Sequence, residues 1–220
     1  GHLLNNDGQE SKAVDCYQHA LKLKPDMAEA WNNLGLIMRR RQVFNEALRC
    51  FQKAIESHPD LTEAYYNLGK LFYQSDQIEK AISSFKRVLE LKPDSADAHI
   101  KLADIMQARS LPDKALGHYH EALAIEPLSA ELNNKIGNLY KHDREWKSAL
   151  KHFYRAVELK PDMPDAHFNL GYVYGELGDT AKAIQFYRRV LEIEPDSSET
   201  LNNLAALMAS QNRLEDAIQL

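Results

Sequence analysis

Apolar residues recur along this chain at i, i+3, i+4 and i+7, the spacing that places side chains on one face of an α-helix. Two of these runs are Trp31-Leu34-Gly35-Met38 and His167-Leu170-Gly171-Tyr174. The small third residue lets two helix backbones approach closely, and the bulky residues fill the space around it. A second run follows, with alanine before an aromatic residue and alanine or valine after it, as in Ala47, Phe51 and Ala54. The pattern therefore predicts alternating helices, each with one apolar face.

These runs return with a period of 34 residues, which prolines mark at constant spacing: Pro25, Pro59, Pro93, Pro127, Pro161 and Pro195. Such a period has to be interpreted as a repeat before anything else. We number each unit from the third residue after its proline, so that Ala28 is position 1 of the first full unit. The full units are 28–61, 62–95, 96–129, 130–163 and 164–197, with partial units 1–27 and 198–220. Because the partial units begin and end within a helix, we expect a fragment of a longer array.

The side chains within the period resemble the tetratricopeptide repeat (TPR), whose signature is W-x2-L-G-x2-Y, then A-x3-F, then P. The resemblance covers the whole chain. It implies an all-α fold, a right-handed α-solenoid of antiparallel helix pairs whose first helices line a concave groove. One unit alone cannot bury its apolar face, so stacked neighbours share a continuous core. We therefore expect a single array over residues 1–220.

The proline of each unit and the residues after it predict where helices end and begin. Proline cannot continue a helix, so the second helix should end before it. Asp26 then lies where an N-cap belongs, with Glu29 three residues later in a capping-box arrangement. The arrangement recurs after all the remaining prolines of the series except Pro127. There Leu128 replaces the aspartate, and Ser129 is the expected cap. We interpret these acids as caps rather than ligands.

Position 6 lies about 200° around the helix from the core position 4, so its side chain should face the groove. Its occupants are Asn33, Asn67, Lys101, Lys135, Asn169 and Asn203. An asparagine amide both accepts and donates hydrogen bonds, so a column of them could hold the backbone of an extended peptide. The column is similar to the asparagine ladder in the repeats of O-linked N-acetylglucosamine transferase, interrupted here by two lysines. The alternative is that asparagine belongs to the ordinary sequence of the repeat.

Positions 5, 6, 9, 12 and 13 should share the groove face, and basic residues outnumber Asp104 and Glu176 there: Arg39, Arg40, Lys70, Lys101, Lys135 and Lys141. Tyr73, Asn138 and Tyr172 complete the candidate site. The excess of positive charge favours binding of an acidic or carboxylate-ended segment. The alternative is a solvated charged face, because the acids at position 2 could offset the excess from the groove rim.

Composition excludes several other classes of protein. The chain of 220 residues has a formal net charge of −5, whereas nucleic-acid-binding domains are usually basic. Its longest apolar stretch, residues 204–209, is far too short to cross a bilayer. The two cysteines fit a reducing compartment and favour the cytoplasm. No metal-ligand spacing, phosphate-binding loop or catalytic motif interrupts the repeat, so we expect no metal, no cofactor and no enzymatic activity in this segment.

The function predicted from these features is a non-catalytic scaffold whose groove holds an extended partner segment, with a preference for an acidic one. Two alternatives stay open. The segment could be the substrate-recognition arm of a larger enzyme such as a glycosyltransferase. It could instead be an assembly module that self-associates head to tail through its repeat ends.

Overall fold

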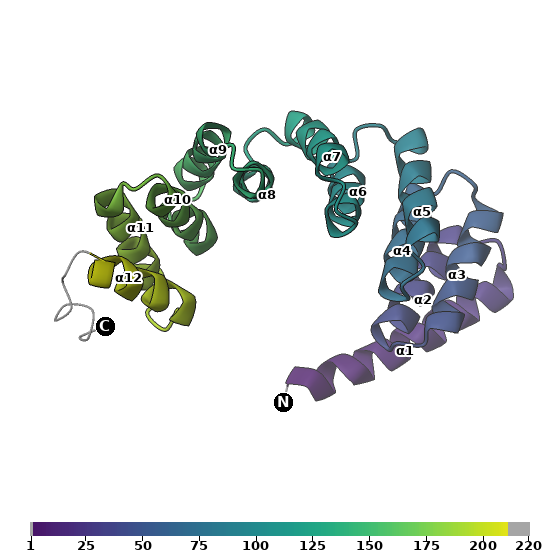
Figure 1. The fold of residues 1–220 in the computed structure, drawn as a ribbon. Coiled ribbons are helices and arrows are strands. Elements are labelled where there is room, and N and C mark those ends of the chain that lie inside the picture. The colour runs from purple at the N-terminus through teal and green to yellow at the C-terminus, as the bar shows by residue number, and fades with distance from the viewer. Residues whose placement is uncertain (1, 211–220) are drawn as a thin grey trace. The chain divides into compact units, whose positions relative to one another are not determined.

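The structure is a computed structural model that describes the backbone of residues 2–210 and the side chains of residues 10–209. Throughout this range every regular element is an α-helix (Figure 1). The helices are α1 (His2–Leu23), α2 (Ala28–Arg40), α3 (Phe44–Ser57), α4 (Thr62–Gln74), α5 (Ile78–Leu91), α6 (Ala96–Ala108), α7 (Pro112–Ile125), α8 (Ala130–His142), α9 (Trp146–Leu159), α10 (Pro164–Glu176), α11 (Thr180–Ile193) and α12 (Ser198–Ser210). The predicted all-α fold is confirmed.

The helices form two compact units, α1 to α6 and α7 to α12. Within each unit every helix packs against the next one along the chain. Alternate helices also touch, α2 with α4 in the first unit and α8 with α10 in the second. This is the packing of an α-solenoid, in which each repeat contacts only its neighbours. The even-numbered helices, α2 to α12, all begin at position 1 of a 34-residue repeat.

A buried aromatic ring lies directly against the glycine at position 8 of the repeat. A Cβ atom added at Gly137 would lie 2.6 Å from Cε1 of Phe153, a residue that is 0% exposed. The same contact joins three further pairs: Gly35 with Phe51, Gly69 with Phe85, and Gly171 with Tyr187. The close approach predicted for the small residue is therefore confirmed, because no side chain fits between the helix and the ring.

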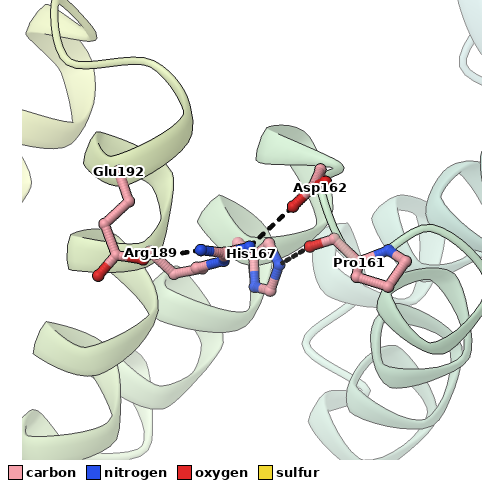
Figure 2. A network of polar contacts seen from close by, with 5 residues as sticks. All are labelled: Pro161, Asp162, His167, Arg189 and Glu192. Carbon is pink, nitrogen blue, oxygen red and sulfur yellow. Dashed lines mark hydrogen bonds and ion pairs between the residues drawn. The ribbon is translucent and has the colours of Figure 1, made fainter.

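The ring at position 4 also ties the first helix to the turn that precedes it. Trp31 Nε1 donates to the carbonyl oxygen of Pro25 at 2.8 Å. His167 Nε2 lies 2.7 Å from the carbonyl oxygen of Pro161 (Figure 2), so it carries the proton and donates. The next residue in that turn, Asp162, accepts from Arg189 Nη2 at 2.7 Å. Ring and guanidinium thus hold the same turn from two directions.

The predicted aspartate caps are wrong. Helix α2 begins at Ala28, its N-cap is Met27, and no side chain caps it. Asp26 therefore lies one residue before the N-cap position, because the turn after the proline is one residue longer than the predicted capping box requires. Asp162 shows what such an aspartate does instead, since it pairs with Arg189.

The serine cap predicted for the repeat without an aspartate is confirmed. Ser129 is the N-cap of α8, and its Oγ accepts from the backbone N–H of Leu132 at 3.2 Å. Ser95 caps α6 in the same way through the N–H of Ala98 at 3.4 Å. In that repeat the sequence had pointed to Asp94. Where the residue before the helix is a serine, its hydroxyl reaches the free N–H groups of the first turn.

The turn between the two helices of a repeat carries a left-handed residue at position 15. Gln42, Asp76, Ser110 and Arg144 have φ angles of 60°, 56°, 57° and 58°, and Gly178 has a φ of 77°. After α2, the N–H of Val43 bonds the carbonyl oxygen of Met38 at 2.9 Å. This is the six-to-one bond of a Schellman motif, which requires a left-handed residue just before its donor.

Candidate functional site

The position-6 column does not present a uniform row of amides. Asn67 and Asn169 are buried, with exposed fractions of 8% and 5%. The other four members, Asn33, Lys101, Lys135 and Asn203, are half-buried. The two kinds of residue therefore have different surroundings, and hydrogen bonds explain the difference.

The buried pair of asparagines bonds to asparagines of the preceding repeat. Asn67 Nδ2 on α4 donates to Asn32 Oδ1 on α2 at 3.0 Å. Asn169 Nδ2 on α10 donates to Asn134 Oδ1 on α8, also at 3.0 Å. In both pairs the partners stand at position 6 of one repeat and position 5 of the repeat before it. These amides join neighbouring first helices, a role that the sequence signals by asparagines spaced 35 residues apart.

Four of the predicted groove residues meet in the first unit. Arg39 on α2, Lys70 and Tyr73 on α4, and Lys101 on α6 line one cavity of about 260 Å³, which we call the basic pocket. Its remaining lining residues are Gln74, Phe85, Asp104 and Ile105. Sequence reasoning missed Phe85 because its position was assigned to the core, and it passed over Gln74 although this residue lies at position 13 of the predicted groove face.

Positive charge dominates the basic pocket, where three cations face one carboxylate. Lys101 Nζ lies 3.7 Å from Asp104 Oδ2. Arg39 Nη1 donates to Gln74 Oε1 at 3.2 Å, and its buried Nε has no hydrogen-bond partner among the described residues. Burial, followed by the charges of Arg39 and Lys101, lowers the pKa of Lys70 below its usual value. The basic pocket therefore holds three cations that repel each other, and Lys70 among them is partly desolvated.

The predicted groove residues of the second unit make a more closed arrangement. Lys141 Nζ donates to Asn169 Oδ1 and lies 5.2 Å from the centre of the Tyr172 ring. Burial is the main cause that lowers the pKa of Lys141. Lys135 Nζ lies 5.4 Å from the Tyr119 ring. Cation–π contacts of this kind hold both lysines over aromatic faces.

The last three predicted residues have separate surroundings. Asn138 is half-buried on α8. Asn203 on α12 makes a side-chain hydrogen bond with Tyr187. Arg40 lies outside the basic pocket and pairs with Glu10 of α1, with Nη2 and Oε1 3.0 Å apart. Of the predicted set, the structure thus brings together chiefly the four residues of the basic pocket.

Neither a metal centre nor a membrane span is found within the part of the chain that the structure describes. No three of its His, Cys, Asp or Glu side chains are placed to hold a metal ion together. No helix among residues 2–210 combines the length and apolar character needed to cross a membrane.

The stacked helix pairs define a helical-repeat protein. Sequence models agree: those of the tetratricopeptide repeat match residues 26–94, 66–130, 164–197 and 186–219. A further TPR repeat model matches residues 1–40 and 145–178. The chain belongs to the tetratricopeptide repeat family. A search of curated protein sequences found no significant match.

Several solved structures share the fold at low sequence identity. YrrB, described as a TPR protein with an unusual peptide-binding site, is 21% identical with a TM-score of 0.71, covering 86% of this chain and 97% of its own. MamA from Desulfovibrio magneticus RS-1 is 22% identical with a TM-score of 0.69, covering 78% and 97%. PilF from Pseudomonas aeruginosa is 15% identical with a TM-score of 0.73, covering 96% and 90%. At these identities the likeness establishes the fold alone.

Proposed function

We propose that this chain is a non-catalytic protein-interaction scaffold, and that its basic pocket binds an acidic residue of an extended partner segment. The observation that carries the proposal is the convergence of Arg39, Lys70 and Lys101 from three helices on one cavity with a single acid. The peptide-binding site in the description of YrrB, a protein of the same fold, supports a partner of this kind.

The chemistry of the pocket suits a carboxylate attached to an apolar stem. A carboxylate has two oxygens that accept charge-assisted hydrogen bonds, which are stronger than neutral ones. It would offset the mutual repulsion of Lys70, Arg39 and Lys101, and its oxygens are acceptors for donors such as Arg39 Nε. The methylene stem of the same side chain would contact Phe85 and Ile105, which also line the cavity.

The asparagine column would contribute less than its regular spacing suggests. Asn67 already donates to Asn32, and Asn169 both donates to Asn134 and accepts from Lys141. The half-buried Asn33 is the member best able to bond the backbone of a segment seated in the first unit. In the second unit, Lys135, Asn138, Lys141, Tyr172 and Asn203 remain our candidates for further contacts.

Two labelled peptides test the proposal, one with glutamate alternating with leucine and one in which glutamine replaces every glutamate. We expect the acidic peptide to bind more tightly in fluorescence anisotropy, with an affinity that falls as salt is added. Lys70→Glu with Lys101→Glu should weaken it about tenfold or more, the equivalent of about 1.4 kcal/mol or more.

The matched control reverses two exposed lysines of the same unit, Lys24→Glu with Lys86→Glu. This variant has the same net charge as the pocket variant, so long-range repulsion affects both equally. Equal loss of affinity in the two variants would show that net charge, not the basic pocket, determines binding. Equal affinity for the two peptides would refute the preference for an acidic partner.

A further inference from the structure

A second cavity, which we call the seam cavity, lies in the second unit among α7, α8 and α9 and measures about 500 Å³. None of its lining residues belongs to the basic pocket or to the predicted groove residues. Leu123 and Pro127 line it from α7 and the turn that follows, Asn133 from α8, and His152 and Arg155 from α9. Tyr154, Lys151 and Glu158 complete the lining.

The seam cavity lies where this repeat departs from the others at position 4. Position 4 carries a ring in four of the five full repeats: Trp31, Tyr65, His99 and His167. In the fifth it carries Asn133. An equivalent cavity beside Trp31 measures only about 300 Å³, and its Leu21 and Cys50 correspond in the repeat to Leu123 and His152.

Hydrogen bonds within its own unit hold the side chain of Asn133 in place. It is 3% exposed, its Nδ2 donates to Ser129 O at 2.9 Å, and its Oδ1 lies 3.1 Å from His152 Nδ1. His152 is fixed further by stacking on Tyr140, with ring centres 5.7 Å apart. Both ends of the Asn133 amide are therefore used within the protein.

The carbonyl group of Pro127 lacks the ring donor that two of its equivalents have. Pro25 and Pro161 each accept a hydrogen bond from the ring six residues later, Trp31 and His167. Pro127 stands six residues before Asn133, and no hydrogen bond to its carbonyl oxygen is found in the described range. Because Pro127 is exposed, its carbonyl oxygen is accessible to a ligand that donates a hydrogen bond.

Two further features of the same repeat suit an aromatic guest. Arg87 lies 5.8 Å over the ring of Tyr65, which is its position-4 neighbour. Arg155 has the same place in its repeat and, within the described part of the chain, forms one ion pair, with Glu158 at 3.0 Å. Next to Pro127, Leu128 replaces the usual aspartate and is 71% exposed. The guanidinium of Arg155 therefore lies at the seam cavity, and Leu128 adds an exposed apolar side chain next to Pro127 in the sequence.

We propose that the seam cavity binds the side chain of a tryptophan from a partner protein, in the place that Trp31 occupies in its own repeat. The indole N–H would donate to the carbonyl oxygen of Pro127, and its ring would lie under the Arg155 guanidinium. A neutral guest is favoured because Glu158 is already paired and burial lowers the pKa of His152 to about 4. The site needs no contribution from the groove, so it is independent of the function proposed above.

N-acetyl-L-tryptophanamide is the probe, titrated against the 220-residue chain while the NMR signals of Tyr154 and His152 are followed. We expect saturable binding. The 1-methylindole analogue cannot donate, so it should bind about fivefold more weakly or worse, the value of one hydrogen bond. Equal binding of the two probes, or no saturable binding of either, would overturn the proposal.

The variant Asn133→Trp fills the cavity from within and should abolish probe binding. Asn202→Trp, which adds the same side chain at an exposed site of the same unit, should bind the probe as the unchanged protein does. Circular dichroism should show that Asn133→Trp unfolds at the same temperature or higher. A clear loss of stability in this variant would show that an indole does not fit the cavity and would equally overturn the proposal.

Discussion

At the scale of single residues, this fold depends on how little space position 8 allows. In four repeats a glycine there touches the face of a buried aromatic ring of the second helix. Among the glycines that the structure describes, Gly117 has no such role, because a Cβ added there would meet nothing within 4 Å. The same residue type is thus required at one position and dispensable at another.

A pair of alanine substitutions separates the two situations. Gly137→Ala forces a methyl group against Phe153, and overpacking of this kind costs about 1–3 kcal/mol. Gly117→Ala, in the middle of α7, should instead stabilise by about 0.5–1 kcal/mol through helix propensity. Urea unfolding of the two variants measures both values. Stabilisation by Gly137→Ala would contradict the close contact with the ring.

The sequence could predict the groove residues singly but not their partners. Arg39, Lys70 and Lys101 were placed on one face by helical spacing alone, and the structure brings them to one pocket. The burial of Asn67 could not be predicted in this way, because it depends on how closely α4 approaches Asn32 on α2. Helical spacing describes one helix, whereas burial depends on the angle between two.

At the scale of elements, the first helices of neighbouring repeats are joined by polar as well as apolar contacts. The bond between Asn67 and Asn32 links α4 to α2, and the bond between Asn169 and Asn134 links α10 to α8. Both are buried, where an unmade hydrogen bond is costly. The asparagines therefore fix the register between repeats.

Two members of the same column should respond differently to truncation. Asn67→Ala leaves Asn32 Oδ1 without its donor and should cost about 1–3 kcal/mol. Asn33→Ala removes a half-buried amide and should change the free energy of unfolding by less than about 0.5 kcal/mol. Chemical denaturation followed by circular dichroism measures the difference. Similar losses in both variants would argue against the special role of the Asn67–Asn32 bond.

At the scale of the molecule, stability should be distributed locally along the chain. A solenoid repeat gains its stability from itself and its nearest neighbours. The 34-residue period made the all-α repeat fold predictable, since pattern and period agree throughout. The division into two compact units was not predictable, because the period runs through residue 110 unchanged.

Hydrogen exchange of two core variants tests this local character. Phe153→Ala should cost about 3–5 kcal/mol and expose the amides of α8, α9 and α10, which pack together. The amides of α2 and α3 should keep their protection. Phe51→Ala is the matched variant of the first unit and should give the reverse result. Loss of protection across all helices in either variant would indicate a single cooperative transition instead.

The left-handed residue at position 15 also offers a way to change the stability of one repeat at a time. Gln42, Asp76, Ser110 and Arg144 adopt a conformation that costs a residue with a Cβ about 1–2 kcal/mol, and only Gly178 adopts it freely. Exchanging glycine with another residue there alters the strain of one repeat without touching any ligand-facing side chain. Substitutions at these turns can therefore make the local stability of the repeats rise or fall along the chain.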